Sequence, residues 1–436
     1  MLKISGAVSI VVDASTDGPG ELWLDGGSVV APAPNGPHET LEVSGHVVTP
    51  GLVNAHHHLL QSAFRTLPGT RGVSMAEWLP AMASAYARVG VDPELVAIST
   101  SIGVAEGLLS GVTTVADHML NWAGTPLIDS VRIAVSIAGS ARSLGGRLVF
   151  VRGSAGDDPE MAASSAEAIV NTLLPRTRGG VSDDGMLQLA VGPAGVHSDS
   201  REAFELLGEV ARNHGLRRRT QANEQVDVAI AREKYGRRPL DLLEDWEWLA
   251  EDVTIAHLVA VTDDEIARLV RAGVTGTHAP GCDVPMGWGV APVAALRDAG
   301  VVLGLGTSGG GSNDAGHLLA DARLALQVSG LIGPQLSARE VLAMATSGSA
   351  AGLGRAELGH LRAGAAADLC VWDVSGVADA GVADPVAGLL WAAPGRRPRH
   401  VLVGGEFVVR DYELVNADER ELVARLHERL ARTPIS

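Results

Sequence analysis

Three consecutive histidines close an apolar run early in the chain, in a pattern suited to binding a metal ion. Residues 49–59 read TPGLVNAHHHL. In an extended strand, side chains two apart share a face, so His56 and His58 point the same way and His57 points to the opposite face. Paired imidazoles are nitrogen ligands of the kind that zinc prefers. The pattern predicts a site role for His56 and His58, with a metal ion, a substrate or each other as the partner.

Short apolar runs recur along the middle of the chain. Between residues 50 and 355, a β-branched run, a polar or Gly-containing loop and an Ala/Leu-rich amphipathic stretch alternate. The runs cover residues 52–55, 112–116, 148–151, 187–191, 216–220, 253–256, 274–277 and 301–305. Strands alternating with helices in this way predict a closed (β/α)8 TIM barrel, an α/β fold whose catalytic groups lie at the C-terminal ends of the strands.

Polar side chains at or just past these strand ends form the candidate site. They are His56, His58, Asp117, His118, Arg152, Gln221, Glu224, His257, His278 and Ser308. Four residues of the intervening loops are expected to contact a substrate there, namely Gln61, Trp78, Trp288 and Asn313. Some have a structural interpretation as well, because His278 suits a satisfied core histidine, Trp78 suits plain core and His118 suits the tether of a loop.

The two ends of the chain differ from the middle. They are rich in Val, Gly and short alternating runs, which predict strands rather than long helices. We expect residues 1–50 and 358–436 to form a small composite β-sandwich domain, and residues 51–357 to form the barrel.

Charge and composition narrow the class of partner. The net charge of -17 over 436 residues argues against nucleic acid, because a phosphate backbone is bound by clustered Lys and Arg. Residues 1–5 are not followed by the long apolar core of a signal peptide, two cysteines cannot make a disulfide framework, and no uncharged run is long enough to span a bilayer. These features predict a cytoplasmic protein that acts on a small molecule, away from membranes.

The motifs resemble those of the amidohydrolase superfamily, in the branch that contains 8-oxoguanine deaminase and triazine hydrolase. The resemblance covers nearly the whole chain. It rests on residues 50–59, on GVTTVADH at 111–118, on 256–257, on MGWG at 286–289 and on 309–314. It implies a metal-dependent, deaminase-like hydrolase of C–N or similar leaving-group bonds in N-heterocycles, and a homodimer.

The resemblance also implies roles for residues. In such enzymes one divalent ion, most often zinc, is held by the first-strand histidine pair, a His on the fifth strand and an Asp on the eighth. His56 and His58 match the pair, Glu224 matches the carboxylate that shuttles the proton, and His257 matches the histidine that polarises the attacking or leaving group. No organic cofactor is implied. Residues 304–309 spell G-x-G-x-x-G, but they follow the eighth strand instead of opening a βαβ unit.

Two ligand positions depart from that pattern, since Gln221 stands at the fifth-strand His and Ser308 at the eighth-strand Asp. An amide oxygen is a poor zinc ligand, so His257 or Glu224 would have to take the third place. Arg219 shares the inward face with Gln221. Its guanidinium is expected to pair with Glu224, clamp a substrate carboxylate or replace part of the ion's charge, unless it reaches out of the barrel to a structural acid.

Three functions remain open from the sequence. The first is hydrolysis with a metal kept by His56, His58 and a rearranged third ligand, with Ser308 in the catalytic set. The second is a metal-independent enzyme that uses Glu224 and His257 for acid–base cyclisation, elimination or dehydration. The third is a catalytically inactive relative that binds a ligand. Hydrolysis ranks first.

Overall fold

The computed structural model describes residues 1–33, 36–122 and 124–433, and its centre is a parallel sheet. Each predicted run forms part of it. Along the chain its strands are β8 (Leu52–His58), β9 (Val112–Met119), β10 (Arg147–Ser154), β11 (Leu187–Pro193), β12 (Arg217–Ala222), β13 (Val253–His257), β14 (Thr275–His278), β15 (Leu303–Leu305) and β16 (Ser308–Gly309).

The last two strands are parts of one, broken at Gly306 and Thr307. β15 pairs with β14, and β16 pairs with β8, so the two edges of the sheet meet. A Cβ atom at Gly306 would lie 2.7 Å from the Cβ of His56 and 2.8 Å from its backbone nitrogen, so only glycine permits this approach. The predicted (β/α)8 barrel is confirmed, with an eighth strand that is interrupted where it passes the first.

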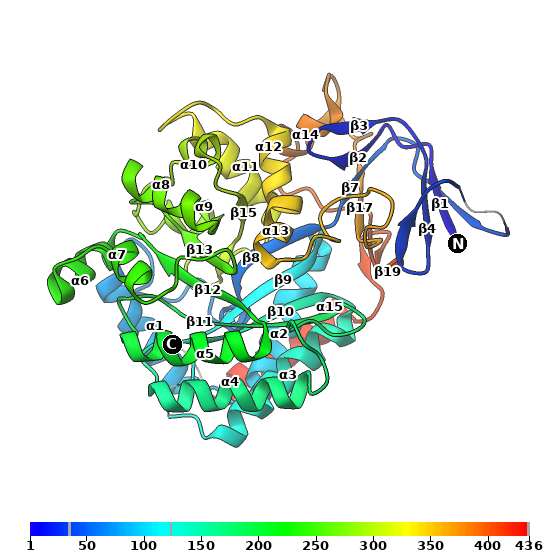
Figure 1. Ribbon diagram of the computed structural model, residues 1–436. Helices are drawn as coiled ribbons and strands as arrows, with labels where there is room; N and C mark the ends of the chain where they lie inside the picture. The colour runs from blue at the N-terminus through cyan, green and yellow to red at the C-terminus, as the bar shows by residue number, and fades with distance from the viewer. Residues whose placement is uncertain (34–35, 123, 434–436) are drawn as a thin grey trace.

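Helices surround the sheet on its outer face (Figure 1). The segments between and after the barrel strands contain η1 (Leu59–Ala63), α1 (Met75–Val89), α2 (Pro93–Leu109), α3 (Leu127–Leu144), α4 (Pro159–Leu173), α5 (Arg201–His214), α6 (Val226–Tyr235), α7 (Pro239–Asp245), α8 (Asp263–Ala272), α9 (Pro280–Asp283), α10 (Val293–Ala299), α11 (Leu318–Ser329), α12 (Ala338–Ala343), η2 (Met344–Gly348) and α13 (Ser349–Leu353).

Local sequence signals set the bounds of several of these helices. At the start of α2 the carboxylate of Asp92 accepts a hydrogen bond from the backbone of the third helical residue, and a proline follows it as the first helical residue. Asp158 does the same for α4. Gly215 and Gly273 end α5 and α8 in the left-handed conformation that glycine adopts most readily. These capping residues thus set where the helices that connect the barrel strands begin and end.

Strands from both ends of the chain pair with one another beside the barrel (Figure 1). One sheet has the order β5-β4-β1-β6 and the other the order β20-β19-β18-β17-β7-β2-β3, and side chains of both fill one apolar cluster. The strands are β1 (Leu2–Ser5), β2 (Ser9–Asp13), β3 (Thr16–Gly18), β4 (Leu22–Asp25), β5 (Ser28–Val30), β6 (Glu39–Glu42), β7 (His46–Pro50), β17 (Leu369–Asp373), β18 (His400–Val403), β19 (Glu406–Arg410) and β20 (Glu413–Leu414).

The C-terminal part also contains helices. They are η3 (Val377–Asp379), α14 (Pro385–Trp391) and α15 (Glu419–Ala431). The last of these packs on the barrel, because Arg429 forms an ion pair with Asp92 at the start of α2, at 2.9 Å. Among the helices of the described residues, none has the length and apolar character needed to cross a bilayer.

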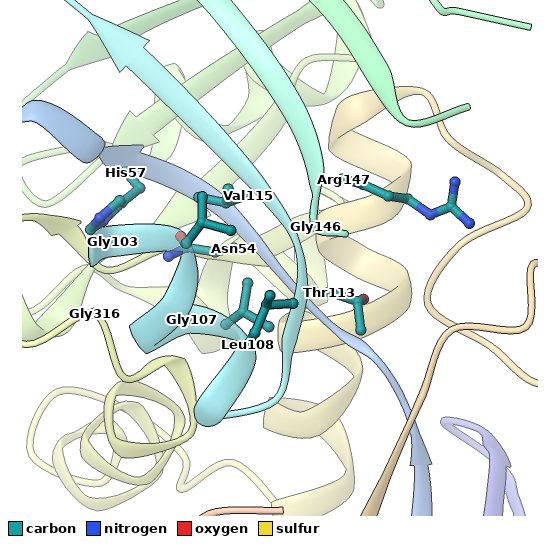
Figure 2. Close-up of a pocket in the computed structure, with 12 residues that line it drawn as sticks. Asn54, His57, Gly103, Gly107, Leu108, Thr113, Val115, Gly146, Arg147 and Gly316 are labelled. Carbon is teal, nitrogen blue, oxygen red and sulfur yellow. The ribbon is translucent and has the colours of Figure 1, made fainter. Parts of the chain in front are cut away.

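A small cavity of about 10 Å³ lies between β8, β9 and α2 (Figure 2). His57 faces this side of the sheet, and its Nδ1 lies 2.8 Å from the hydroxyl of Thr307. The volume is close to that of a single water molecule. His57 is therefore turned away from the barrel mouth, as the alternation of side chains along β8 predicts.

A buried ion pair joins the barrel to the terminal sheets, and its removal should destabilise the fold. Arg147 binds Asp368 through two hydrogen bonds of 2.7 and 2.9 Å, and Arg147→Met leaves that carboxylate buried without its cation. We expect the free energy of unfolding, measured by denaturant titration, to fall by about 3–5 kcal/mol. Arg201→Met, which breaks an exposed pair with Glu205, is the control and should change it little. Equal effects of the two substitutions would contradict this account.

Candidate functional site

A cavity of about 700 Å³ opens at the C-terminal ends of the barrel strands, a size typical of small-molecule sites. Its polar floor comes from four elements, β8, the end of β12, β13 and β16. Helix α1 contributes an apolar wall that includes Met82 and Leu79. The residues predicted from the sequence that line it are His58, Gln61, Trp78, Gln221, Glu224, His257, Trp288 and Ser308.

Three imidazoles approach one another here, with His58 and His257 lining the cavity and His56 buried beside them. The ring centroid of His56 lies 4.9 Å from that of His58 and 5.3 Å from that of His257. Nδ1 of His58 donates to the backbone carbonyl of His118 at 2.7 Å, and a carbonyl can only accept, so this nitrogen carries the proton. Burial lowers the pKa of His58 to about 4. His58 is therefore neutral at physiological pH and its Nε2 holds a free lone pair.

Nε2 of His56 is buried and has no hydrogen-bond partner among the described residues. Burial, and next the neighbouring ring of His58, lower the pKa of His56 well below its usual value. Unpaired polar atoms are rare in protein interiors because their desolvation is not compensated. The unpaired nitrogen of His56 and the free Nε2 of His58 fit a nitrogen-binding ion, which prefers neutral imidazole.

His257 is the histidine of this cluster that has carboxylates beside it. Its Nδ1 donates to Oδ1 of Asp283 at 2.6 Å, and its Nε2 lies 3.1 Å from Oε1 of Gln221 and 3.8 Å from Oε1 of Glu224. Burial alone would lower the pKa of His257, but the carboxylates of Asp283 and Glu224 outweigh it and raise the pKa to about 8. A carboxylate on the far nitrogen is the usual support of a metal-binding histidine, because it fixes the tautomer and the ring orientation.

Glu224 is buried, and neither of its carboxyl oxygens has a hydrogen-bond partner among the residues that the structure describes. The residue follows β12 closely, where its backbone nitrogen donates to Oδ1 of Asp227 at 2.7 Å. Burial raises the pKa of Glu224. The carboxyl group therefore holds a proton more tightly than an exposed glutamate does, which suits a general acid or base.

The two altered positions face the same cavity. The side-chain oxygen of Gln221 is engaged by His257, and the hydroxyl of Ser308 lies 3.4 Å from that of Ser312. Behind them, Arg219 donates to the backbone carbonyl of Ala55, next to His56. Burial lowers the pKa of Arg219 to about 9. Arg219 points inward as expected, but it does not line the cavity, and its recorded hydrogen bond is to backbone rather than to Glu224.

Three expected site residues lie elsewhere. Arg152 points to the outer side of β10, where it pairs with Asp157 at 2.8 Å and lies over the ring of Trp122. Asn313 donates to the carbonyl of Thr307 and to Asp321, so it holds its own loop together. His278 borders a different cavity, of about 220 Å³.

His118, Gln61 and Trp78 also form hydrogen bonds that hold backbone segments near the cavity. Nε2 of His118 bonds to the carbonyl of Gly192 at 2.8 Å, and its ring stacks on that of His58. Gln61 and Trp78 both bond to the backbone of Gly311 while they line the cavity. These side chains shape the loops around the floor as well as its walls.

The sequence did not point to three residues that the fold brings to the site. Cys282 and Asp283 belong to the short helix α9 after β14, and His197 lies in the loop after β11. Among the described residues, ligand atoms of His257, Cys282 and Asp283 all lie within 4.8 Å of one another. Burial raises the pKa of the Cys282 thiol, so a thiolate there needs a cation beside it. Their position after barrel strands was the available signal, since loops at this end carry the catalytic groups.

Comparisons with known proteins agree with this architecture. The chain is 33% identical over 395 residues to the 8-oxoguanine deaminase of Pseudomonas aeruginosa, covering 86% of this chain and 85% of the relative. It is 31% identical to a 5-methylthioadenosine/S-adenosylhomocysteine deaminase of Halobacterium salinarum, over 99% and 98% of the two chains.

The structure is similar to that of atrazine chlorohydrolase TrzN from Arthrobacter aurescens TC1 complexed with zinc, with a TM-score of 0.91, 31% identity and coverage of 99% and 100%. The profile of the amidohydrolase family matches residues 47–408, which include the whole barrel and its histidine cluster. The chain therefore belongs to the amidohydrolase family of hydrolases.

Proposed function

We propose that the protein hydrolyses a bond between a ring carbon and an exocyclic amino group, or a similar leaving group, of a small uncharged N-heterocycle, with one divalent ion held by His56, His58 and His257. The observation that carries the proposal is the set of buried, unpaired atoms at the floor of the cavity and next to it. Nε2 of His56 and both carboxyl oxygens of Glu224 have no partner among the described residues, although they are shielded from water. An ion and a substrate would satisfy them.

The ion, when bound, supplies positive charge that lowers the pKa of a water molecule to near neutrality. The side chains of the protein then handle protons. Glu224 accepts a proton from the attacking water and returns it to the leaving nitrogen, a role that its raised pKa supports. His257, whose Nδ1 is held by Asp283, would present Nε2 to the ion, so in this arrangement it orients the ion and donates no proton.

The walls of the cavity indicate the class of substrate. The described residues that line it include neither Lys nor Arg, and Glu224 is their one acidic member. A phosphate or carboxylate group would therefore find no Lys or Arg side chain to pair with in the cavity wall. Trp288 contacts the ring of His257 edge-on, with the ring centroids 5.3 Å apart, and Trp78 and Met82 line the cavity from α1. These surfaces suit a planar, uncharged ring with an apolar substituent.

A second candidate function has two observations in its favour. Nε2 of His257 is already engaged by Gln221, and the cation of Arg219 lies beside His56. Both features would suit a site without a metal ion, in which Glu224 and His257 perform acid–base chemistry alone. We rank this candidate below hydrolysis because it leaves the unpaired nitrogen of His56 unexplained.

The proposed reaction can be tested on the substrates of the relatives. We expect the zinc-loaded protein to release ammonia from 8-oxoguanine or 5-methylthioadenosine, or chloride from atrazine. Glu224→Gln keeps the size of the side chain but cannot take up a proton, so kcat should fall by about 10²–10⁴-fold with zinc content unchanged.

Glu205→Gln, on the outer surface of α5, is the matched control and should keep the wild-type rate. A wild-type protein that binds zinc but releases nothing from this panel, or a Glu224→Gln variant as fast as the wild type, would refute the assignment.

Replacing Gln221 by His separates the two candidate functions. The new imidazole would stand where Oε1 of Gln221 now lies, 3.1 Å from Nε2 of His257. If the wild type already binds an ion, Gln221→His should tighten zinc binding by about 10-fold or more, measured by competition with a chelating dye. If instead the wild type binds no zinc and the variant does, the metal-free candidate is supported.

The pairing of His257 with Asp283 predicts a pH-dependent stability of the metal-free protein. The raised pKa means that the folded state binds the proton more tightly than the unfolded chain. The stabilisation is complete below pH 6.5, the ordinary pKa of histidine, and is lost as the pH rises through about 8.

We expect the free energy of unfolding to decrease by about 2 kcal/mol across that interval in the wild type. Asp283→Asn should abolish the decrease, whereas Asp298→Asn, which removes an exposed carboxylate, should preserve it. A wild-type stability that is flat from pH 6 to pH 9 would count against the buried pair.

A further inference from the structure

Cys282 is a buried thiol at the floor of the cavity. It lies on α9, is 2% exposed, and lines the cavity together with Ser308 and His257. Its Sγ is within hydrogen-bonding reach of the hydroxyls of Ser308 and Ser312. The thiol therefore stands beside the eighth-strand position at which the family motif has an aspartate and this chain has a hydroxyl.

The other cysteine, Cys370, has a structural hydrogen bond and lies outside the cavity. Sγ of Cys370 donates to the backbone carbonyl of Gly111 at 3.2 Å and lies between the barrel and the terminal sheet, away from the cavity. Cys282 instead has ligand atoms of His257 and Asp283 within 4.8 Å. Oδ2 of Asp283 has no hydrogen-bond partner among the described residues, although the side chain is fully buried. It lies 3.8 Å from Nδ1 of His278, beyond hydrogen-bonding distance, so this oxygen is free to accept a cation or a further donor.

Charge balance points to the same residue. His56, His58 and His257 are neutral ligands when they bind a cation, so the set proposed above offers a divalent ion no negative charge. Gln221 and Ser308 are neutral as well. Three imidazoles can hold zinc without an anionic ligand, but an anion bound to the ion would strengthen the binding in low-dielectric surroundings. The Cys282 thiol, which lines the cavity together with Ser308, is a group that can become anionic there.

We infer that Cys282 Sγ is the anionic ligand of the metal ion, replacing the carboxylate that this chain lacks on its eighth strand. The inference rests on the proposed function in requiring an ion at His56, His58 and His257. On binding, the thiol proton is released to solvent and one sulfur–metal bond forms, with no change in oxidation state. A thiolate among imidazoles favours zinc or cobalt over magnesium or calcium.

Cobalt(II) substitution tests the inference without relying on activity. In the wild-type protein loaded with one equivalent of cobalt, we expect a near-ultraviolet thiolate-to-cobalt charge-transfer band together with visible ligand-field bands. Cys282→Ser should lose the charge-transfer band and weaken zinc binding by more than about 10-fold. Cys370→Ser, the matched control, should keep both.

The variant Cys282→Asp distinguishes the loss of a metal ligand from a folding defect. A carboxylate at this position should restore tight zinc binding but give visible bands only. Cobalt bound by the wild type without a charge-transfer band overturns the role of Cys282 and leaves the hydrolytic function standing. A charge-transfer band that survives in Cys282→Ser overturns it as well. If the wild type binds no cobalt or zinc, the inference fails. Whether the protein hydrolyses any member of the substrate panel then decides separately whether the proposed function holds.

Discussion

The site depends on the seam at which the barrel closes. Asn54, on β8, donates from Nδ2 to the hydroxyl of Thr307 at 2.8 Å, and the backbone nitrogen of Thr307 donates to Oδ1 of Asn54 at 3.2 Å. These buried bonds satisfy polar groups where the eighth strand is broken and no regular ladder can do so. Because His56 follows Asn54 and Ser308 follows Thr307, the same seam fixes the imidazole pair relative to the last strand.

Burial then divides the site into two parts with different chemistry. His56 and His58 have no acidic partner, so desolvation keeps their pKa values low and leaves them as neutral ligands. His257 is equally buried, but the carboxylates of Asp283 and Glu224 raise its pKa. Groups of one type are thus pushed apart in pKa by their surroundings, so that without an ion His257 holds a proton that His56 and His58 do not.

Much of the fold was predictable from periodicity. The apolar runs and the amphipathic stretches between them gave every barrel strand to within a few residues, because a parallel strand covered on both faces must be apolar almost throughout. The same property explains why Arg152 was expected to line the cavity although it lies on the outer face of β10. Both faces of β10 are apolar, with Val149 and Val151 on one and Leu148 and Phe150 on the other, so the sequence does not say which face is inward. Arg152 shares the face of Phe150, under the helices.

Some site residues were also predictable, and others were not. The alternation along β8 separates His56 and His58 from His57, and the position after β12 identifies Glu224. No comparable sequence pattern joins Cys282 or Asp283 to His257, which lies on another strand. That juxtaposition depends on the path of the loop after β14 and on a one-turn helix, α9, which has no periodic signal.

The sequence by itself therefore determined the order of the strands, the end of the barrel at which polar groups collect and the orientation of the first histidine pair. These follow from side-chain alternation and burial, which are local properties of the chain. Only the tertiary structure decided which polar groups are left without partners and which carboxylate supports which imidazole. Those relations join residues on different strands, and they are set by the closure of the barrel and by the removal of water from its mouth.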